Sequence, residues 1–165
     1  MIFLILEMRS IVMYFCREIS EADLGALPDL AAELGYKVTI EEIKETFSCL
    51  ENDETNKLFI TETEDKMVIG WVHVSIYRTL ITKKTAIVLG LVVSSDYRKA
   101  GIGRMLMEKA ELWAQAKGCL GIRLYSNITR TEAHQFYHRL GYEETANSLL
   151  LQKCLDNKPS VLFHK

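Results

Sequence analysis

Hydrophobic residues recur along this chain with two spacings, one typical of strands and one typical of helices. Together they predict alternating strands and helices. β-Branched and aromatic runs are typical of strands, and the strands they predict span 14–19, 57–63, 67–77, 85–93 and 120–126. The run 85–93 is almost wholly apolar, which favours a strand buried on both faces. Two weaker runs near 142–145 and 149–154 are expected to form the last strands.

Helices are predicted between these runs from their capping residues and apolar faces. Ser20 with Asp23, and Thr39 with Glu42, have the spacing of capping boxes, and Pro28 is expected to bend the first helix. The helices are expected to span 21–34, 40–50, 102–117 and 130–140. The resulting order, β-α-α-β-β-β-α-β-α-β-β, predicts one α/β domain on a mixed sheet.

Length and composition fit a single domain with short ends. The 165 residues are 48% hydrophobic and 25% charged, and 20 basic against 22 acidic residues give a net charge of −2. No basic field would attract nucleic acid or a membrane surface, so we expect neither as a partner. The apolar start Met1–Glu7 is too short to span a bilayer and lacks the basic residues of a signal peptide. We expect a cytoplasmic protein with an accessory extension over 1–12, a domain over 13–154 and a tail over 155–165.

Neither the cysteines nor the histidines have the pattern of a metal site. No Cys-x-x-Cys pair is present, and reduced thiols are expected for the four cysteines, Cys16, Cys49, Cys119 and Cys154. His134 and His138 are spaced as a helical metal pair, but the glutamate of the zinc-hydrolase motif and a third ligand are missing. No neighbouring base selects one cysteine as an acyl-carrying nucleophile. The sequence therefore predicts no metal and no cysteine nucleophile.

The segment Leu91–Arg104 carries the most specific candidate chemistry. An apolar strand ends, a short loop follows, and a helix begins at Gly101 and Gly103. The N-terminus of a helix has unpaired N–H groups and a partial positive charge, so it binds phosphate. Glycines without a Cβ let a phosphate approach the backbone closely. The segment therefore predicts a local pyrophosphate site on a weakly acidic protein.

Positive side chains strengthen this interpretation, and two other phosphate-binding patterns do not fit. Arg98, Lys99 and Arg104 lie at the same end of the helix. The Gly-Lys-Ser/Thr of a P-loop is absent, and Leu106 stands at the third glycine of a dinucleotide fingerprint. A capped helix with a solvated basic end stays open as the alternative without a ligand.

Two segments, Leu91–Arg104 and Ala133–Tyr142, together resemble the GNAT (N-acetyltransferase) superfamily. The second has the pattern Ala-x-x-Phe-Tyr-x-x-x-Gly-Tyr, and the spacing between the two segments also fits. The resemblance runs from Tyr14 to Lys153 and is stronger after Thr85 than before it. It implies a mixed, mostly antiparallel, splayed central sheet of six to seven strands flanked by about four helices.

The resemblance also implies that acetyl-coenzyme A binds along the strand 85–93 as co-substrate. Backbone groups of Leu91 and Val93 would pair with the pantetheine arm, as a peptide strand adds to a sheet edge. One main-chain N–H near Val92 would polarise the thioester carbonyl. The pyrophosphate would contact the loop and first helical turn, formed by Arg98, Lys99, Ala100, Gly101, Ile102, Gly103 and Arg104.

Tyr137 matches the family tyrosine that protonates the departing thiolate. A phenol of pKa ~10 can donate to the sulfur of a thiol of pKa ~8.5 as it leaves. A packing role on the apolar face of its helix is the alternative. Arg130 stands where the family often has asparagine, and it is expected to reach a phosphate or to lie in the first helical turn. Asn127 is expected to take over the contact with the cofactor arm.

The general base is the second departure from the family, because the strand 85–93 lacks the glutamate that many members carry there. The amine proton is expected to leave through water, with His73, Tyr125 and Glu33 as candidate relays. His73 alternates with Trp71 along its strand, so it is expected to face the cleft. A half-buried histidine with a satisfied hydrogen bond is the alternative.

The resemblance implies an N-acetyltransferase that moves an acetyl group to a primary amine by direct attack in a ternary complex. A non-catalytic acyl-coenzyme A sensor on the same fold stays open, because the strand glutamate is absent. The acceptor is a small amine, an aminoglycoside-like molecule or a protein or peptide amine, and a homodimer stays open as the assembly. Trp113–Cys119 and Leu140–Thr145 are similar to parts of aminoglycoside 6′-acetyltransferases. The acceptor cleft would be rimmed by 34–39, 75–82 and 144–148.

Overall fold

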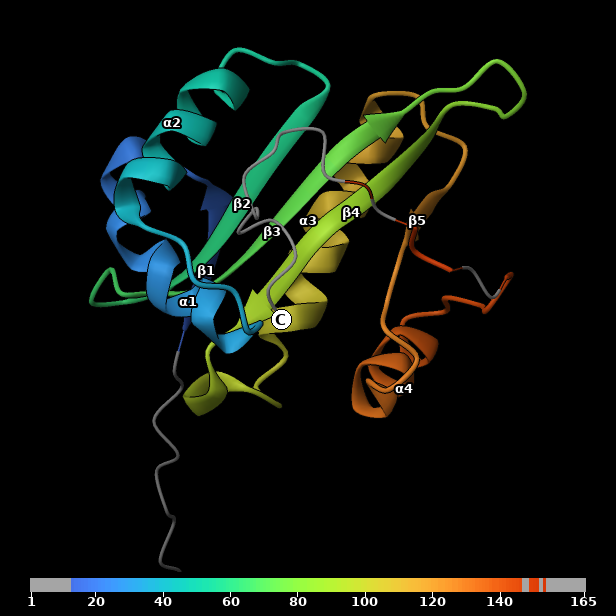
Figure 1. The fold of residues 1–165 in the computed structure, drawn as a ribbon. Helices are drawn as coiled ribbons and strands as arrows, with labels where there is room; N and C mark the ends of the chain where they lie inside the picture. The colour runs from blue at the N-terminus through green and yellow to red at the C-terminus, as the bar shows by residue number, and fades with distance from the viewer. Residues whose placement is uncertain (1–12, 147–148, 152, 154–165) are drawn as a thin grey trace, which may run out of the picture.

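The computed structural model describes residues 13–146, 149–151 and 153, which form a twisted five-stranded sheet with helices on both faces (Figure 1). The strands are β1 (Tyr14–Glu18), β2 (Asn56–Thr63), β3 (Val68–Tyr77), β4 (Thr85–Val93) and β5 (Ile122–Leu124). The helices are η1 (Glu21–Ala26), α1 (Leu27–Glu33), α2 (Ile40–Leu50), η2 (Ser95–Tyr97), α3 (Ile102–Ala116) and α4 (Thr131–Arg139). In Figure 1, α1 and α2 cover one face of the sheet and α3 covers the other.

The strands follow one another in sequence order across the sheet, and the last pair is the only parallel one among the described strands. β1 to β4 pair antiparallel; short loops join β2 to β3 and β3 to β4, whereas η1, α1 and α2 lie between β1 and β2. β5 pairs parallel to β4 over Ala86–Val88 alone. From Leu89 onward, no described strand covers the β5 side of β4, so β4 has an open edge in the interior of the fold.

A bulge at Leu89 divides β4 into two halves. Val88 pairs with Val74 and Gly90 pairs with His73, so Leu89 has no partner on β3. An extra residue in one strand reverses which side chains face each side of the sheet. Val88 therefore packs on the α3 side, whereas Val92 packs against α1 on the other side.

Two hydrophobic clusters hold these layers together. The larger cluster lies between the sheet and α3, where Leu106, Met107 and Ala110 are fully buried. The smaller cluster joins η1 and α1 to β4 through residues such as Leu24 and Val92. Burial of apolar side chains on both faces fixes the position of β4, and with it the open edge.

Most of the predicted elements are confirmed, and β4 has the predicted bounds. The Thr39–Glu42 capping box is formed: the Glu42 N–H donates to Thr39 Oγ1 at 3.2 Å, and the Thr39 N–H donates to the Glu42 carboxylate at 2.7 Å. The expected burial of the strand 85–93 on both faces holds at Ala86 and Val88 but fails at Leu89, which is 56% exposed because it lies in the bulge.

The first helix is not one bent helix but two short ones. A 3-10 helix, η1, is followed directly by α1, and Pro28 lies in the first turn of α1. Proline is tolerated there because the N–H it lacks would have no helical partner. The cap is formed, since the Ser20 N–H donates to the Asp23 carboxylate at 2.7 Å.

The predicted strand over 142–145 is absent, and the described part of the sheet has five strands, not six or seven. Gly141, with φ +90°, ends α4 and turns the chain back. The Tyr142 N–H then donates to the Tyr137 carbonyl, and His138 Nδ1 donates to the Tyr142 carbonyl at 3.0 Å. Since α4 takes up both backbone groups of Tyr142, they cannot join a ladder.

The predicted strand over 149–154 falls partly outside the described residues, and its described residues, 149–151 and 153, are not in a strand. The segments 1–12 and 155–165 lie outside the described residues, as does Cys154. The other three cysteines are free thiols. In the described part of the chain, no helix has the length and apolar character needed to cross a membrane.

Candidate active site

A cavity of about 580 Å³ lies where β4 and β5 separate. One wall is the open part of β4 from Val88 to Leu91, and the opposite wall is the chain that follows β5, Leu124–Asn127. Arg130, Ala133 and Tyr137 of the α4 segment and residues 32–36 at the end of α1 complete the lining. We call this the first cavity. It places an unpaired strand edge beside Tyr137.

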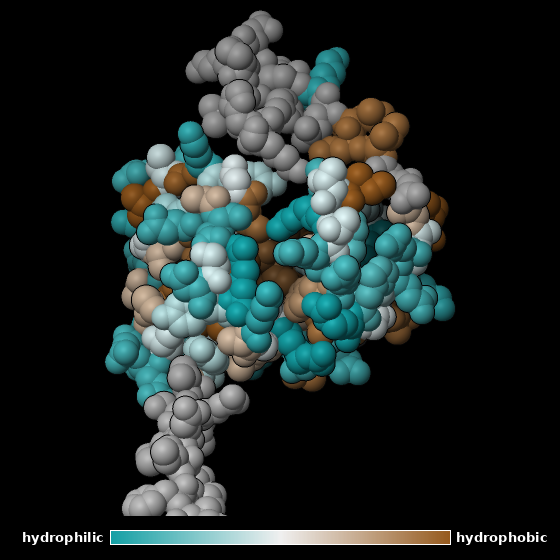
Figure 2. All heavy atoms as spheres, turned by 90° about the horizontal axis from the view of Figure 1, so that it is seen from below, coloured by the Kyte–Doolittle hydropathy of each residue, from teal (hydrophilic) through white to brown (hydrophobic). Residues whose placement is uncertain are grey.

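A second cavity of about 330 Å³ adjoins the first. The two share Leu34, Tyr36, Leu89 and Gly90 in their walls. The second cavity lies between α1–α2 and β3–β4, and Trp71 lies in its wall. Figure 2 views the molecule from the end where β4 finishes, and a hollow in this mostly hydrophilic face exposes hydrophobic atoms. The bulge of β4 therefore lies in the wall of both cavities.

Two buried polar atoms beside these cavities lack a hydrogen-bond partner among the described residues. They are Ser126 Oγ, in a residue that lines the first cavity, and Trp71 Nε1, in a residue that lines the second. An unpaired buried polar group costs about 1–3 kcal/mol. Such groups are typical of binding sites, where a ligand or water satisfies them.

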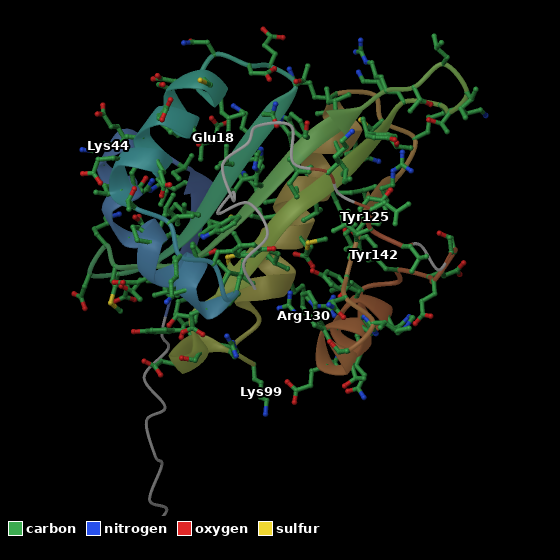
Figure 3. All side chains as sticks on the ribbon, viewed as in Figure 1. Glu18, Lys44, Lys99, Tyr125, Arg130 and Tyr142 are labelled. Atoms are coloured by element: carbon green, nitrogen blue, oxygen red, sulfur yellow. The ribbon has the colours of Figure 1, made fainter. Side chains whose placement is uncertain are left out.

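The predicted phosphate loop has a left-handed backbone at two positions. Gly101 has φ +85° and Lys99 has φ +65°, a conformation that costs a non-glycine residue about 1 kcal/mol. No atom lies within 4 Å of the place where a Cβ of Gly101 would stand. The N–H groups in the first turn of α3, which follows this turn, have no partner within the helix. In Figure 3, Lys99 extends from the loop away from the molecule, and Arg130 lies near the start of α4, on the side toward α3 and β4.

Gly103 has a packing role that the sequence did not indicate. A Cβ on Gly103 would lie 3.1 Å from Phe136 Cζ and 3.8 Å from Val93 Cγ2. The missing Cβ therefore lets α4 pack closely against the start of α3. The two family-like segments meet at this contact. The pattern within either segment alone does not indicate it.

Arg98 is already partnered in this structure. Its guanidinium lies 2.7 Å from a Glu33 carboxylate oxygen, and its Nε donates to the Val93 carbonyl at 3.2 Å. Glu33 also accepts from the N–H and hydroxyl of Ser95 at 3.1 and 2.9 Å. These hydrogen bonds, with the Arg98 charge, lower the pKa of Glu33. Glu33 is thus a poor proton acceptor, and Arg98 ties the loop to the end of α1.

Three of the predicted cofactor residues line the first cavity, namely Leu91, Asn127 and Arg130. Val92 and Val93 continue the open strand edge from Leu91. Ala100 is exposed in the loop, Ile102 is a buried residue at the start of α3, and Arg104 is exposed near Glu108. The side-chain oxygen of Asn127 accepts from the Thr129 N–H at 3.0 Å.

Tyr137 is largely buried beside the first cavity, with its ring packed edge-on against two other aromatic rings. The ring centroids of Phe136 and Tyr142 lie 5.1 and 5.8 Å from that of Tyr137. Burial raises the pKa of Tyr137, and the positive charge of Arg130 opposes this shift. Tyr137 is therefore a protonated phenol at neutral pH, able to donate a hydrogen bond.

His73 lines the second cavity, not the first, directly across the strand pair from Gly90. Its Nε2 lies 2.9 Å from Asn56 Oδ1, a partner that sequence patterns did not indicate. Burial lowers the pKa of His73, so the ring is neutral at neutral pH. The third candidate relay, Tyr125, lines the first cavity and is 71% exposed.

Within the described ranges, no group of three or more His, Cys, Asp or Glu side chains is arranged to hold a metal ion.

Comparisons with known proteins agree with this geometry. The family model of the acetyltransferase (GNAT) family matches residues 21–142. An aminoglycoside N(6′)-acetyltransferase type 1 from Acinetobacter genomosp. 13 is 29% identical over 72 residues, which are 44% of this chain and 49% of that protein. The match thus spans about half the length of this curated relative.

Solved structures share the fold at low sequence identity. The aminoglycoside antibiotic 6′-N-acetyltransferase AAC(6′)-Ih from Acinetobacter baumannii superposes with a TM-score of 0.77 at 21% identity, covering 87% of this chain and 100% of that one. The aminoglycoside N-acetyltransferase AAC(6′)-Iy in complex with CoA superposes with a TM-score of 0.79 at 18% identity, covering 86% of this chain and 95% of that one.

Proposed function

This chain belongs to the acetyltransferase (GNAT) family, and from that premise we propose that it transfers the acetyl group of acetyl-coenzyme A to a primary amine. The observation that carries the proposal is the open edge of β4, which runs along the first cavity toward the N-terminus of α3. Pantetheine amides can pair with a strand edge, and a helix N-terminus binds the pyrophosphate. One continuous surface thus offers sites for both halves of coenzyme A.

The cavity residues fit this co-substrate. Leu91 and Val93 supply the strand edge, and the turn at Lys99 and Gly101 leaves the N–H groups of α3 accessible. Ser126 Oγ supplies a buried hydroxyl that lacks a partner among the described residues. The thioester of the bound co-substrate supplies the acetyl group.

The chain's own groups would promote direct transfer in a ternary complex. The amine nitrogen attacks the thioester carbon, so a C–N bond forms and the C–S bond breaks. A main-chain N–H near Val92 stabilises the negative charge on the carbonyl oxygen. The walls of the two cavities hold the reactants in line, which is a large part of the rate enhancement.

Tyr137 acts as the general acid toward the departing sulfur. The usual tyrosine pKa is already ~1.5 units above that of a thiol, and burial widens this gap. Full proton transfer before the bond breaks is therefore unfavourable, and Tyr137 contributes a hydrogen bond that strengthens as charge develops on sulfur. The nearby charge of Arg130 makes the phenol a better donor.

The acceptor enters through the second cavity, and its walls favour an amine carried on an apolar body. Most of the lining is apolar, from Leu24, Leu27, Val38, Ile43, Phe47, Leu58 and Trp71. Of the two carboxylates that line the cavities, Glu33 is paired with Arg98, and Glu42 accepts from Thr39 with one oxygen and keeps its charge. Among the described residues, the walls thus offer one unpaired carboxylate, whereas a polycationic aminoglycoside, the substrate class in the relatives' names, favours several.

Turnover tests the activity and its acceptor class together. Purified protein is mixed with acetyl-coenzyme A and a panel of amines, and free thiol is measured. We expect phenylethylamine or octylamine to give a higher kcat/KM than an aminoglycoside with a 6′-amine. A higher kcat/KM for the aminoglycoside would contradict the acceptor class alone. Binding of acetyl-coenzyme A by calorimetry without transfer to any amine would favour a sensor and contradict the proposed activity.

A further inference from the structure

A chain of hydrogen bonds links the loop after α2 to His73 on β3. Asn56 Nδ2 donates to Asp53 Oδ2 at 2.6 Å, and Asn56 Oδ1 lies 2.9 Å from His73 Nε2. An ionised carboxylate only accepts hydrogen bonds, so Asp53 requires the NH2 end of the Asn56 amide. The amide oxygen then faces His73, and it accepts only from a protonated nitrogen. The proton of the neutral ring is therefore on Nε2, and Nδ1 keeps its lone pair.

We propose that His73 Nδ1 is the general base for the acceptor amine, and that Asp53 and Asn56 are positioning residues that set its tautomer. The inference rests on the proposed function and supplies the base that β4 lacks. It specifies which ring nitrogen accepts the proton. It also assigns a positioning role to Asp53 and Asn56, which lie outside both family-like segments.

The position of His73 suits this role. It pairs with Gly90, next to the bulge of β4, and Gly90 lines both cavities. An amine in the second cavity thus passes His73 before it reaches the thioester beside Leu91. A base acts directly at hydrogen-bond distance or through one water.

The proton transfer balances without another reactant. His73 Nδ1 takes one proton as the amine nitrogen bonds to the acetyl carbon, and the hydrogen bond from Tyr137 stabilises the departing thiolate. His73 then returns its proton to solvent, and the thiolate takes one proton from solvent. The products are the amide and the free thiol of coenzyme A.

Few other ionisable groups face His73. Glu42 of α2 and Tyr36 line the same cavity, and the Glu42 carboxylate is bound to Thr39. Asp53 acts through Asn56, and the Thr55 N–H and hydroxyl hold its carboxylate at 2.8 and 2.6 Å. These bonds lower the pKa of Asp53 and keep it an acceptor over the working pH range.

Nitrogen NMR of the imidazole rings in the full chain tests the tautomer directly, without an acceptor. We expect His73 to be protonated at Nε2 alone when neutral, with a pKa below 6.5. In Asp53→Asn the residue at 53 can donate or accept, so the Asn56 amide can flip and the Nδ1–H tautomer should appear. His134, whose Nε2 donates to the Asn127 carbonyl at 3.0 Å, is the internal control for the Nε2–H form. Nδ1–H as the main form in the unaltered protein, or no change in Asp53→Asn, would overturn the inference.

Kinetics with the amine of highest kcat/KM completes the test. His73→Gln should lower kcat/KM roughly 100-fold and remove the acidic limb of the pH profile. Asn56→Asp keeps an acceptor for Nε2–H and should shift that limb to higher pH, because a carboxylate raises the histidine pKa. Lys57→Ala, which removes an ion pair with Glu18 one residue along β2 from Asn56, should change neither.

The outcomes separate the two proposals. If the unaltered protein turns over the amine and His73→Gln keeps its rate and pH limb, the base assignment fails and the proposed function stands. If the unaltered protein does not bind acetyl-coenzyme A, the proposed function fails whatever the His73 tautomer is.

Discussion

The ring of Phe136 lies 3.1 Å from the point that a Cβ on Gly103 would occupy. This contact joins the start of α3, where the pyrophosphate site is proposed, to α4, which carries Tyr137. Because Tyr137 is the next residue after Phe136, a shift of the Phe136 ring would also move the proposed general acid. The two halves of the site are therefore mechanically coupled through one small residue.

Gly103→Ala should lower the free energy of unfolding by about 1–3 kcal/mol, because the added methyl overpacks the contact with Phe136. Phe136→Leu in the same chain should recover much of this loss. Gly101→Ala is the matched control, since it costs about 1–2 kcal/mol through its left-handed backbone alone and Phe136→Leu should not rescue it. Urea denaturation of the single and double variants measures this coupling. Equal rescue of both alanine variants would contradict the contact.

Tyr137→Phe should lower kcat roughly 100-fold while the Kd for acetyl-coenzyme A stays nearly unchanged, because only the hydrogen bond to the leaving sulfur is lost. Tyr142→Phe is the control, since the Tyr142 hydroxyl donates to Glu111 at 2.8 Å away from the reacting atoms. Tyr142→Phe should cost about 1 kcal/mol of stability and leave kcat intact. Steady-state kinetics and calorimetry separate the two effects. An unchanged kcat in Tyr137→Phe would remove the acid role.

Arg17→Leu should lower the free energy of unfolding by about 3 kcal/mol at neutral pH. This is at the low end for a broken buried ion pair, because Arg17 is partly exposed and water screens its charge. Arg17 holds two buried carboxylates: both oxygens of Asp23 at 2.7 and 2.8 Å, and Glu62 at 2.6 Å. Without the guanidinium, Asp23 and Glu62 would repel each other. Lys57→Ala, which breaks a more exposed ion pair with Glu18, should cost less than about 1 kcal/mol.

The same cluster predicts how stability depends on pH. Hydrogen bonds from Arg17 lower the pKa of Asp23 from 3.8 to about 2. A lowered carboxyl pKa stabilises the fold above the unfolded value, so this contribution is complete above about pH 4 and is lost as the pH falls toward 2. The loss from Asp23 amounts to about 2 kcal/mol. Urea midpoints between pH 7 and 2 should show this drop in the unaltered protein and a flatter curve in Arg17→Leu. Parallel curves would be inconsistent with the cluster.

Local sequence patterns predicted much of the fold because the decisive interactions are local. The Thr39–Glu42 box lies within one helical turn, and the apolar run 85–93 gave the bounds of β4. The strand expected at 142–145 failed because α4 captures both backbone groups of Tyr142, a contact that periodicity does not encode.

Sequence patterns predicted the candidate site residues whose role follows from their residue type. They missed the roles that depend on packing between distant segments. Tyr137 and the turn at Gly101 followed from motifs; Tyr137 lines the first cavity, and Gly101 caps the start of α3. The role of Gly103 depends on Phe136, and the tautomer of His73 depends on Asn56, which lies 17 positions earlier in the chain. Such relationships arise only when distant segments pack together.

Amide hydrogen exchange with and without coenzyme A tests the central claim most directly, because it reports on the backbone groups proposed to bind. The account predicts slower exchange at Leu91–Val93 and in the turn and first helical residues from Lys99 to Arg104. No binding at millimolar coenzyme A, or binding that protects other segments and leaves these amides unchanged, would contradict it.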